Sequence, residues 1–334
     1  MLKRYKYVFG PVPSRRLGRS LGVDLVPFKH CSYDCVYCQL GRTTNQTVQR
    51  RAYVPLCAVL AELKRKLADC TPDYITLSGS GEPTLYLALG PLIRGIKKIT
   101  KIPVAVLTNG SLLWDRAVQD ALLSADLVVP SLDGGDDAVF QYVNRPHPAI
   151  TFEKMAAGLI DFRKQYSGKI WLEAFILGGI TAIDSEAAKI AKIARQIRPD
   201  RIQLNTVTRP PAEEFAFPVP PQQMHRLRRL FGRNAEVIAD YRAPAGKAAG
   251  VADDAAVLSM LERRPCTLKD IADGIALHPT QAGKILEHLL TARRIVEQRI
   301  GGKAYYKARV CRPAPRRPRS APNKVLPRCR KNNG

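Results

Sequence analysis

The sequence predicts an α/β protein with a parallel sheet, followed by a smaller helical domain. Between Leu21 and about Phe231, short runs of β-branched residues alternate with longer helical patterns, which is the signature of repeated βα units around a parallel sheet. From about Ala252 the pattern changes to three helical segments and a glycine-turned hairpin. A chain of 334 residues is long enough to bury a core in each of two such domains.

The first domain is expected to contain six βα units, which are too few to close an eight-stranded barrel. The expected strands are residues 21–27, 74–78, 104–108, 127–132, 170–177 and 202–207. The expected helices are residues 56–68, 89–100, 115–124, 152–165, 185–197 and 221–231. In βα barrels the reacting groups gather at the C-terminal ends of the strands, so the loops after these strands are where a site is expected.

The second domain resembles a winged helix-turn-helix. The expected elements are helices at residues 254–263, 268–276 and 280–292 and a hairpin over residues 295–307. The hairpin turns on Gly301 and Gly302, and Thr267 is the expected N-cap of the middle helix. The third helix is the candidate recognition helix for DNA.

The domain limits follow from changes in composition. The limits we expect are 1–240 for the sheet domain, 241–250 for a linker rich in Ala, Pro and Gly, 251–311 for the winged-helix-like domain and 312–334 for a basic disordered tail. The tail carries eight Lys or Arg, five Pro and no Asp or Glu. It also lacks the apolar periodicity that could build a core.

The chain is strongly basic, with a formal net charge of +24. Such a charge suggests a polyanionic partner such as tRNA or DNA, although an organism with generally basic proteins would explain it too. No stretch approaches the ~20 apolar residues of a membrane span, so we expect no membrane partner. The eight cysteines do not form the framework of a small secreted protein, and we therefore expect a cytoplasmic location.

The most informative motif is Cys31, Cys35 and Cys38, a C-x3-C-x2-C run that follows the first expected strand. A [4Fe–4S] cluster held by three thiolates keeps one iron without a protein ligand, and that iron can bind a small molecule. The residues just after Cys38 offer no fourth cysteine, unlike a ferredoxin. A zinc site is the alternative, because C-x2-C pairs bind zinc and His30 precedes the motif, but no second C-x2-C pair exists in the chain.

This cysteine spacing resembles the signature of the radical S-adenosylmethionine (radical SAM) superfamily. The resemblance implies a partial (β/α)6 TIM-like barrel, with the cluster at its mouth and the amino and carboxylate groups of SAM on the open iron. It also implies one-electron reduction by a partner such as flavodoxin or ferredoxin, and cleavage of SAM to a 5′-deoxyadenosyl radical. No catalytic residue beyond the cofactor-binding ones is indicated.

A second motif, after the second expected strand, resembles the Gly-Gly-Glu-Pro motif that holds the SAM amino group. Here it reads Gly79-Ser80-Gly81-Glu82-Pro83. Glu82 and the carbonyls around Gly81 are expected acceptors for an ammonium, and the glycines allow close backbone approach. A tight βα turn would explain the same residues without a ligand.

Other expected SAM or substrate contacts lie at later strand ends and beside the cluster. They are Tyr37, Asn109, Ser131, Asp133 and Asn205. Tyr37 is expected against the adenine, or simply packing the cysteine loop. Turn chemistry explains Asn109 nearly as well, because Asn-Gly is an ordinary turn pair. Glu173 lies on the same face of its expected strand as Phe175, and Gln203 on the same face as Asn205. Both are further candidates for the barrel interior, where a carboxylate is costly unless it is paired or used.

The run from Gly10 to Asp24 resembles Fe–S oxidoreductases related to the wyosine-synthase branch of radical SAM proteins, which rebuild a guanine in tRNA. Archaeal wyosine synthases carry extra cysteines ahead of the SAM motif, and residues 1–30 contain none. Three hypotheses therefore follow. The first is a radical SAM enzyme that modifies tRNA or another nucleic acid. The second is a radical SAM activase or oxidoreductase for a protein or metabolite, and the third is a redox-sensing DNA-binding regulator.

Overall fold

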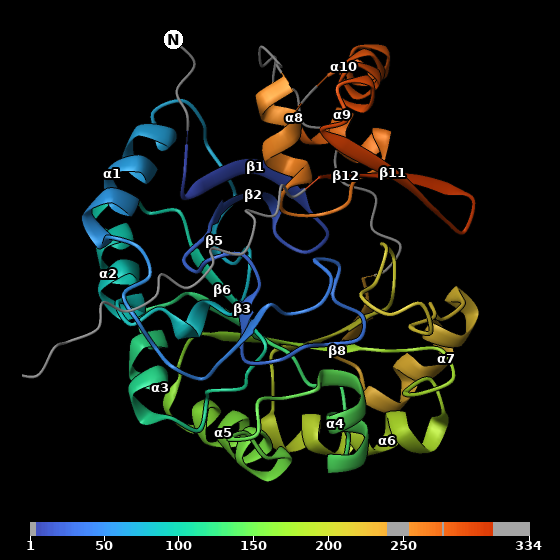
Figure 1. Cartoon of the computed structure of the whole chain (residues 1–334). Coiled ribbons are helices and arrows are strands. Elements are labelled where there is room, and N and C mark those ends of the chain that lie inside the picture. Colours follow the sequence, from blue (N-terminus) through green and yellow to red (C-terminus); the bar gives the residue numbers. More distant parts are fainter. Residues whose placement is uncertain (1–4, 239–253, 276, 310–334) are drawn as a thin grey trace, which may run out of the picture.

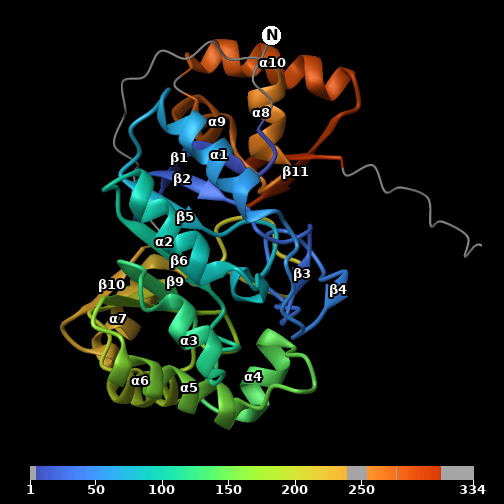
Figure 2. The same ribbon diagram turned by 90° about the vertical axis from the view of Figure 1, so that its left-hand side faces the viewer.

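The protein folds around one eight-stranded, mostly parallel sheet, seen in a computed structural model that describes residues 5–238, 254–275 and 277–309 (Figure 1). The strand order is β1-β2-β5-β6-β7-β8-β9-β10. Strands β1 and β2 pair antiparallel, whereas each later neighbouring pair is parallel. Helices line the outer side of this sheet (Figures 1 and 2). The predicted α/β class with a parallel sheet is therefore confirmed.

The strands of this sheet are β1 (Val8–Ser14), β2 (Gly18–Val23), β5 (Tyr74–Leu77), β6 (Val104–Thr108), β7 (Leu127–Pro130), β8 (Lys169–Phe175), β9 (Arg201–Asn205) and β10 (Ala235–Val237). The helices around it are α1 (Leu56–Leu67), α2 (Leu89–Ile99), α3 (Arg116–Leu122), α4 (Asp137–Asn144), α5 (Phe152–Gln165), α6 (Asp184–Ile197) and α7 (Pro221–Phe231), with a short 3-10 helix at Pro83–Leu85. Two short strands, β3 (His30–Cys31) and β4 (Asn45–Gln46), pair apart from the sheet.

The sequence prediction missed both edge strands and one helix. β1 contains two prolines, which are normally excluded from strands but are tolerated at a sheet edge. β10 has only three residues. α4 is absent from the predicted helices, although the side chain of Asp136 caps it by accepting from the Val139 amide at 2.9 Å. The first predicted strand was also displaced, because β2 begins at Gly18 and ends at Val23.

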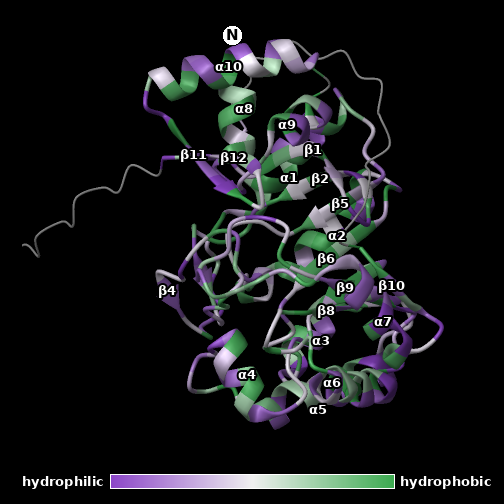
Figure 3. Cartoon of the chain, turned by 90° about the vertical axis from the view of Figure 1, so that its right-hand side faces the viewer, coloured by the Kyte–Doolittle hydropathy of each residue, from purple (hydrophilic) through white to green (hydrophobic). Residues whose placement is uncertain are grey.

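The β1–β2 turn covers the inner face of the curved sheet near the N-terminal ends of its parallel strands. Leu17 in this turn is 2% exposed and packs with Leu127, Val129 and Trp171 in one hydrophobic cluster. The opposite, outer faces of the strands pack against the helices and form the largest hydrophobic core. Figure 3 shows that the central strand β6 is mainly hydrophobic. The interior is therefore a packed hydrophobic core near the N-terminal ends of the strands, and polar groups occupy the part nearer their C-terminal ends.

A layer of polar side chains lies next to this hydrophobic layer, on the side of the C-terminal ends of the strands. The Arg16 guanidinium lies 2.6 Å from Glu173 on β8 and 3.3 Å from Gln203 on β9. Burial raises the pKa of Glu173, but the charge and hydrogen bond of Arg16 outweigh it and leave this pKa below its usual value. The ion pair explains how a carboxylate is tolerated inside the sheet, since a buried charge without a partner is costly.

The C-terminal unit, which we define as the described residues from 254 to 309, has a hydrophobic core of its own. It contains α8 (Asp254–Leu261), α9 (Leu268–Gly274), α10 (Pro279–Thr291) and the hairpin of β11 (Ile295–Ile300) and β12 (Lys303–Ala308). Thr267 caps α9 in a capping box with Asp270, as predicted. Three helices and a hairpin were expected here, and their identity as a winged helix stays a prediction.

The C-terminal unit packs against the sheet on its β1 side (Figures 1 and 2). The Arg263 guanidinium stacks over the Phe9 ring at 4.4 Å. The Tyr305 hydroxyl on β12 donates to the carbonyl of Thr208, just after β9, at 2.7 Å. The expected linker at residues 241–250 and the expected tail at residues 312–334 lie outside the described residues, and the domain limits stay predictions. No described helix is long and apolar enough to cross a lipid bilayer.

Candidate functional site

The three cysteines of the motif lie in a loop between β2 and α1, at the end of the sheet where the parallel strands finish. Cys31 ends β3, which pairs with β4. The backbone then turns, since the Cys38 amide donates to the Cys35 carbonyl at 3.1 Å and the Gly41 amide to the Cys38 carbonyl at 3.0 Å. All three side chains are neither fully buried nor fully exposed.

The cysteine loop docks directly on the glycine-rich loop that follows β5. The Lys29 amide donates to the Ser80 carbonyl at 2.7 Å, and the Glu82 amide donates to the His30 carbonyl at 3.1 Å. A side chain on Gly81 would place its Cβ only 1.8 Å from the His30 carbonyl oxygen. Gly81 is therefore required by close backbone approach, which is one of the two roles expected for these glycines.

Gly79, in the same loop, has a φ of +153°. Its absent side chain makes room for Asp24, whose Cγ would lie 2.6 Å from a Cβ. The Ser80 amide donates to Asp24 Oδ1 at 3.0 Å. Asp24 thus fixes the loop from the end of β2, and burial raises the pKa of its carboxyl group.

The Glu82 carboxylate joins two loops. It is 2% exposed and accepts from the Thr84 amide at 3.0 Å, from the Thr84 and Thr108 hydroxyls at 2.6 Å each, and from the Asn109 amide at 2.8 Å. Burial raises its pKa, and these hydrogen bonds oppose that rise. Within the structure Glu82 is a clamp between the loops after β5 and β6, and Pro83 begins the short helix beside it. Its predicted contact with the SAM ammonium stays a prediction.

Each of the three sulfurs has a side-chain N–H donor within contact distance. Asn109 Nδ2 lies 3.6 Å from Cys31 Sγ, Asn144 Nδ2 lies 3.5 Å from Cys35 Sγ, and Lys29 Nζ lies 3.3 Å from Cys38 Sγ. The three donors come from three different segments, which are the loop after β6, the end of α4 and the loop before β3. Such N–H···S contacts stabilise sulfur that carries negative charge.

The thiols of Cys31 and Cys35 are poor anions in this environment. Burial and, as the smaller contribution, the charge of nearby Glu82 together raise the pKa of Cys31 to about 12. Burial, followed by the charge of Asp133, also raises the pKa of Cys35 well above its usual value. Thiolates at these positions need a cation bound to the sulfurs, which iron would provide.

Within the described residues, no three His, Cys, Asp or Glu side chains are arranged around a single metal ion. A zinc ion would require sulfurs at about 2.3 Å from one point. A cubane differs, because each thiolate binds its own iron and the sulfurs need not converge. The donor set of three thiols, each with an N–H donor, fits a cluster with one iron free of protein ligands.

Asp133 and Tyr37 meet beside the cysteine loop. Asp133, just after β7, is 2% exposed and accepts from the Tyr37 hydroxyl, from Asn144 Nδ2 at 2.8 Å and from the Phe175 amide at 3.1 Å. Burial raises the pKa of Asp133 to about 6, against these hydrogen bonds. The Tyr37 ring stacks on Phe175 with centroids 3.9 Å apart. Ser131, two residues before Asp133, forms an isolated parallel β-bridge with Glu173 through the backbone.

Asn205 is the last residue of β9, and its side chain connects Glu173 on β8 with Arg15 in the β1–β2 turn. Its Nδ2 donates to Glu173 Oε1 at 2.7 Å, and its Oδ1 accepts from Arg15 at 2.8 Å. The structure therefore gathers every predicted site residue around the C-terminal ends of the strands. Their individual roles toward SAM stay predictions.

The sequence analysis did not select Lys29, Arg15, Arg16 or Asn144 as site residues. Asn144 lies 109 residues from Cys35 in sequence, and Arg15 lies 190 residues from Asn205. No local pattern encodes such contacts. Arg and Lys are concentrated in the sequence before the first helix, and this concentration is the only signal that could have pointed to the three basic residues.

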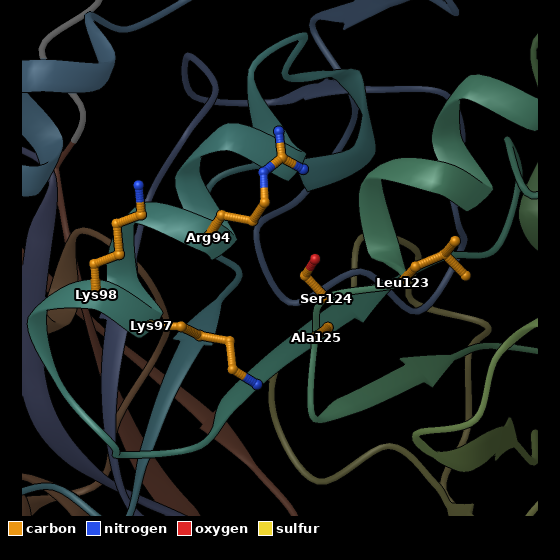
Figure 4. A pocket seen from close by; sticks show the side chains of 6 residues that line it. All are labelled: Arg94, Lys97, Lys98, Leu123, Ser124 and Ala125. Atoms are coloured by element: carbon orange, nitrogen blue, oxygen red, sulfur yellow. The ribbon is translucent and has the colours of Figure 1, made fainter.

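Two surface hollows lie away from the cysteines. One of about 460 Å³ is lined by Arg94, Lys97 and Lys98 of α2 and by residues 123–125 after α3, on the outer side of the sheet (Figure 4). The other, of about 330 Å³, lies between the β1–β2 turn and β9–β10 and includes Arg15, Arg16 and Arg201. Only the second adjoins the polar interior of the sheet.

The chain is similar to known proteins over much of its length. The sequence profile of the radical SAM superfamily matches residues 25–204. The chain is 33% identical to a UPF0026 protein of Helicobacter pylori strain J99, over 90% of this chain and 96% of that protein. It is 40% identical to a Brachyspira hyodysenteriae protein named GTPase Obg, over 90% of this chain but only 45% of that protein, so it spans less than half of that relative.

A solved structure shares the fold. A radical SAM methyltransferase from Sphaerobacter thermophilus superimposes with a TM-score of 0.53 at 18% identity, over 65% of each chain. At this identity the likeness concerns the fold alone.

Substitution of Gly81 by Ala tests the close approach of the two loops. The added Cβ meets a backbone carbonyl, so we expect a loss of about 1–3 kcal/mol in the free energy of unfolding, measured by urea denaturation. Gly283→Ala in α10 is the matched control, since the nearest atom to its Cβ is 4.0 Å away. Alanine in a helix should leave stability equal or raise it by up to about 1 kcal/mol. Equal stability of Gly81→Ala and the wild type would contradict the proposed contact.

Proposed function

Because the chain belongs to the radical SAM superfamily, whose profile spans more than half of it, we propose that Cys31, Cys35 and Cys38 hold the [4Fe–4S] cluster. The protein is a radical SAM enzyme, and the cofactors of this superfamily are such a cluster and SAM. Reduced cluster and SAM together supply the 5′-deoxyadenosyl radical. The observation that carries the residue assignment is the N–H donor beside each of the three sulfurs.

The loops around the cysteines would bind SAM. The carbonyls near Gly81 accept its ammonium, while Glu82 holds the loops after β5 and β6 in register through its four hydrogen bonds. Ser131, Asp133 and Asn205 offer hydroxyl, carboxylate and amide groups at the ends of β7 and β9 for the ribose, the carboxylate or the adenine. Tyr37 is oriented by Asp133 and Phe175 so that its ring borders the same space.

Reduction requires an electron from a partner, for which flavodoxin and ferredoxin are suitable classes. Lys29 favours this step, because its ammonium lies 3.3 Å from Cys38 Sγ and stabilises the added negative charge of a reduced cluster. An oxygen-sensitive cluster of this kind suits a reducing cytoplasm.

A nucleic acid such as tRNA is our candidate substrate class. The formal net charge of +24 supports it, because the phosphate backbone attracts basic proteins without regard to sequence. A base would have to be single-stranded or flipped to reach the mouth of the sheet.

Alanine at Cys31 tests the cluster assignment. After anaerobic reconstitution, Cys31→Ala should lose the visible absorbance of the cluster and form no 5′-deoxyadenosine from SAM and dithionite, as detected by mass spectrometry. Cys57→Ala is the matched control, because Cys57 is an exposed cysteine outside the motif. It should retain both properties. A Cys31→Ala protein with a full cluster and wild-type product would refute the assignment.

Methionine at Lys29 tests the role of the ammonium at nearly constant side-chain length. Loss of the charge and of the N–H···S contact should lower the reduction potential of the cluster by about 60 mV, the one-electron equivalent of a tenfold change. An EPR-monitored redox titration measures it, with Lys284→Met on α10 as a control that should not shift the potential. An unchanged potential in Lys29→Met would show that the contact does not act on the cluster.

Salt dependence tests the nucleic-acid substrate. The affinity for bulk tRNA should fall by at least tenfold between 50 mM and 200 mM salt if several phosphates are contacted, as measured by filter binding. Absence of binding at 50 mM salt would remove nucleic acid as the substrate and favour a protein or a small metabolite.

A further inference from the structure

Arg15 is a largely buried arginine whose side-chain hydrogen bonds go to uncharged groups. Its guanidinium donates to Asn205 Oδ1 at 2.8 Å and to Thr208 Oγ1 at 3.2 Å, both of which are uncharged. Among the described residues it forms no ion pair, in contrast to Arg16 next to it, which pairs with Glu173. A guanidinium has five N–H donors, so Arg15 has donors left for a ligand.

Arg209 follows Thr208 and reaches from the sheet to the C-terminal unit. Its side chain is only 12% exposed, and its Nε donates to the Pro265 carbonyl at 3.1 Å. The closest acid is Asp270, at 4.0 Å, which is the limit of an ion pair. Arg209 is thus a second buried guanidinium whose charge is poorly compensated.

Arg264, in the loop between α8 and α9, is the third cation at this junction. It directly precedes Pro265, to which Arg209 is bonded, and it is partly exposed. It forms no ion pair with an acid in the described part of the chain. A ligand can therefore reach it from the solvent.

The two carboxylates of this region are already engaged elsewhere. Glu173 pairs with Arg16 and accepts from Asn205. Asp270 Oδ2 accepts from the amide and the hydroxyl of Thr267 at 3.0 and 3.1 Å, in the capping box of α9. The three arginines consequently retain an excess of positive charge.

Burial, together with repulsion between these arginines, lowers the pKa values of Arg15 and Arg209. Burial, followed by the charge of Arg209, lowers the pKa of Arg15 to about 10. Burial, followed by the charge of Arg264, lowers the pKa of Arg209. A buried cluster of like charges is unfavourable unless an anion joins it.

We propose that a phosphate group of the substrate binds between Arg15, Arg209 and Arg264, at the junction of the sheet and the C-terminal unit. This inference rests on the proposed function, because it assumes that the substrate occupies the mouth of the sheet. Guanidiniums bind phosphate and carboxylate oxygens through paired hydrogen bonds. Three arginines with one nearby carboxylate, Asp270, leave an excess of about two charges, which matches a phosphate dianion better than a carboxylate.

The position of this site gives the C-terminal unit a role in substrate binding. Arg15 is bonded to Asn205, a predicted SAM contact, so the phosphate lies beside the cofactor site and not within it. The reacting part of the substrate would then extend toward the cysteine loop. On the same side, Lys307 of β12 lies half-buried near Gly41, with its Nζ 4.0 Å from where a Cβ would stand. The mouth of the sheet is thus bordered by both parts of the chain.

Inorganic phosphate is a direct probe of the site. In the full-length protein, isothermal titration calorimetry at constant ionic strength should show phosphate binding that is at least tenfold weaker in Arg264→Ala and in Arg15→Lys. Lys284→Ala, which removes one exposed charge from the same unit, should bind phosphate like the wild type. Thermal unfolding in chloride alone confirms that each variant is folded.

The outcomes separate this proposal from the proposed function. Phosphate binding without any SAM cleavage would leave the anion site standing and refute the radical chemistry. SAM cleavage without phosphate binding, or with binding unchanged in both arginine variants, would overturn the anion site. Acetate binding as tight as phosphate binding would show that the site takes a carboxylate and would overturn the choice of phosphate.

Discussion

The candidate site depends on the contact between two backbones, that of residues 29–31 before the cysteines and that of residues 80–82 after β5. Two hydrogen bonds join them, and the space allows no side chain on Gly81. Because the second segment begins where a buried parallel strand ends, this contact fixes the cysteine loop to the most rigid part of the fold. Glu82 extends the same connection to the loop after β6, which carries Asn109.

Two groups of hydrogen-bonded side chains lie in the interior of the sheet, near this contact. Asn144 touches both Cys35 and Asp133, Asp133 holds Tyr37, and Glu173 links Arg16 with Asn205. Buried polar groups of this kind are stable only when each is paired, and pairing also sets their orientation. The interior is therefore preorganised for a polar ligand next to the cysteines, above the hydrophobic layer around Leu17.

Much of the fold could be predicted from the sequence because its elements have strong periodic patterns. β6, α5 and α7 begin and end at the predicted residues, and the cap at Thr267 is confirmed. The cysteine and glycine loops were recognised because their spacing is local. Arg15, Arg16 and Lys29 could not be assigned, because their partners lie on distant segments and only the folded sheet brings them together. β1 was missed because its prolines are characteristic of loops.

The central claim is that three thiolates hold a cluster whose fourth iron is free for SAM. The EPR spectrum of the reduced, reconstituted protein before and after addition of SAM tests it most directly. We expect the spectrum to change on addition of SAM, because the ligand binds an iron of the cluster itself. A spectrum that SAM leaves unaltered, or a protein that binds only zinc under anaerobic conditions, would contradict the claim.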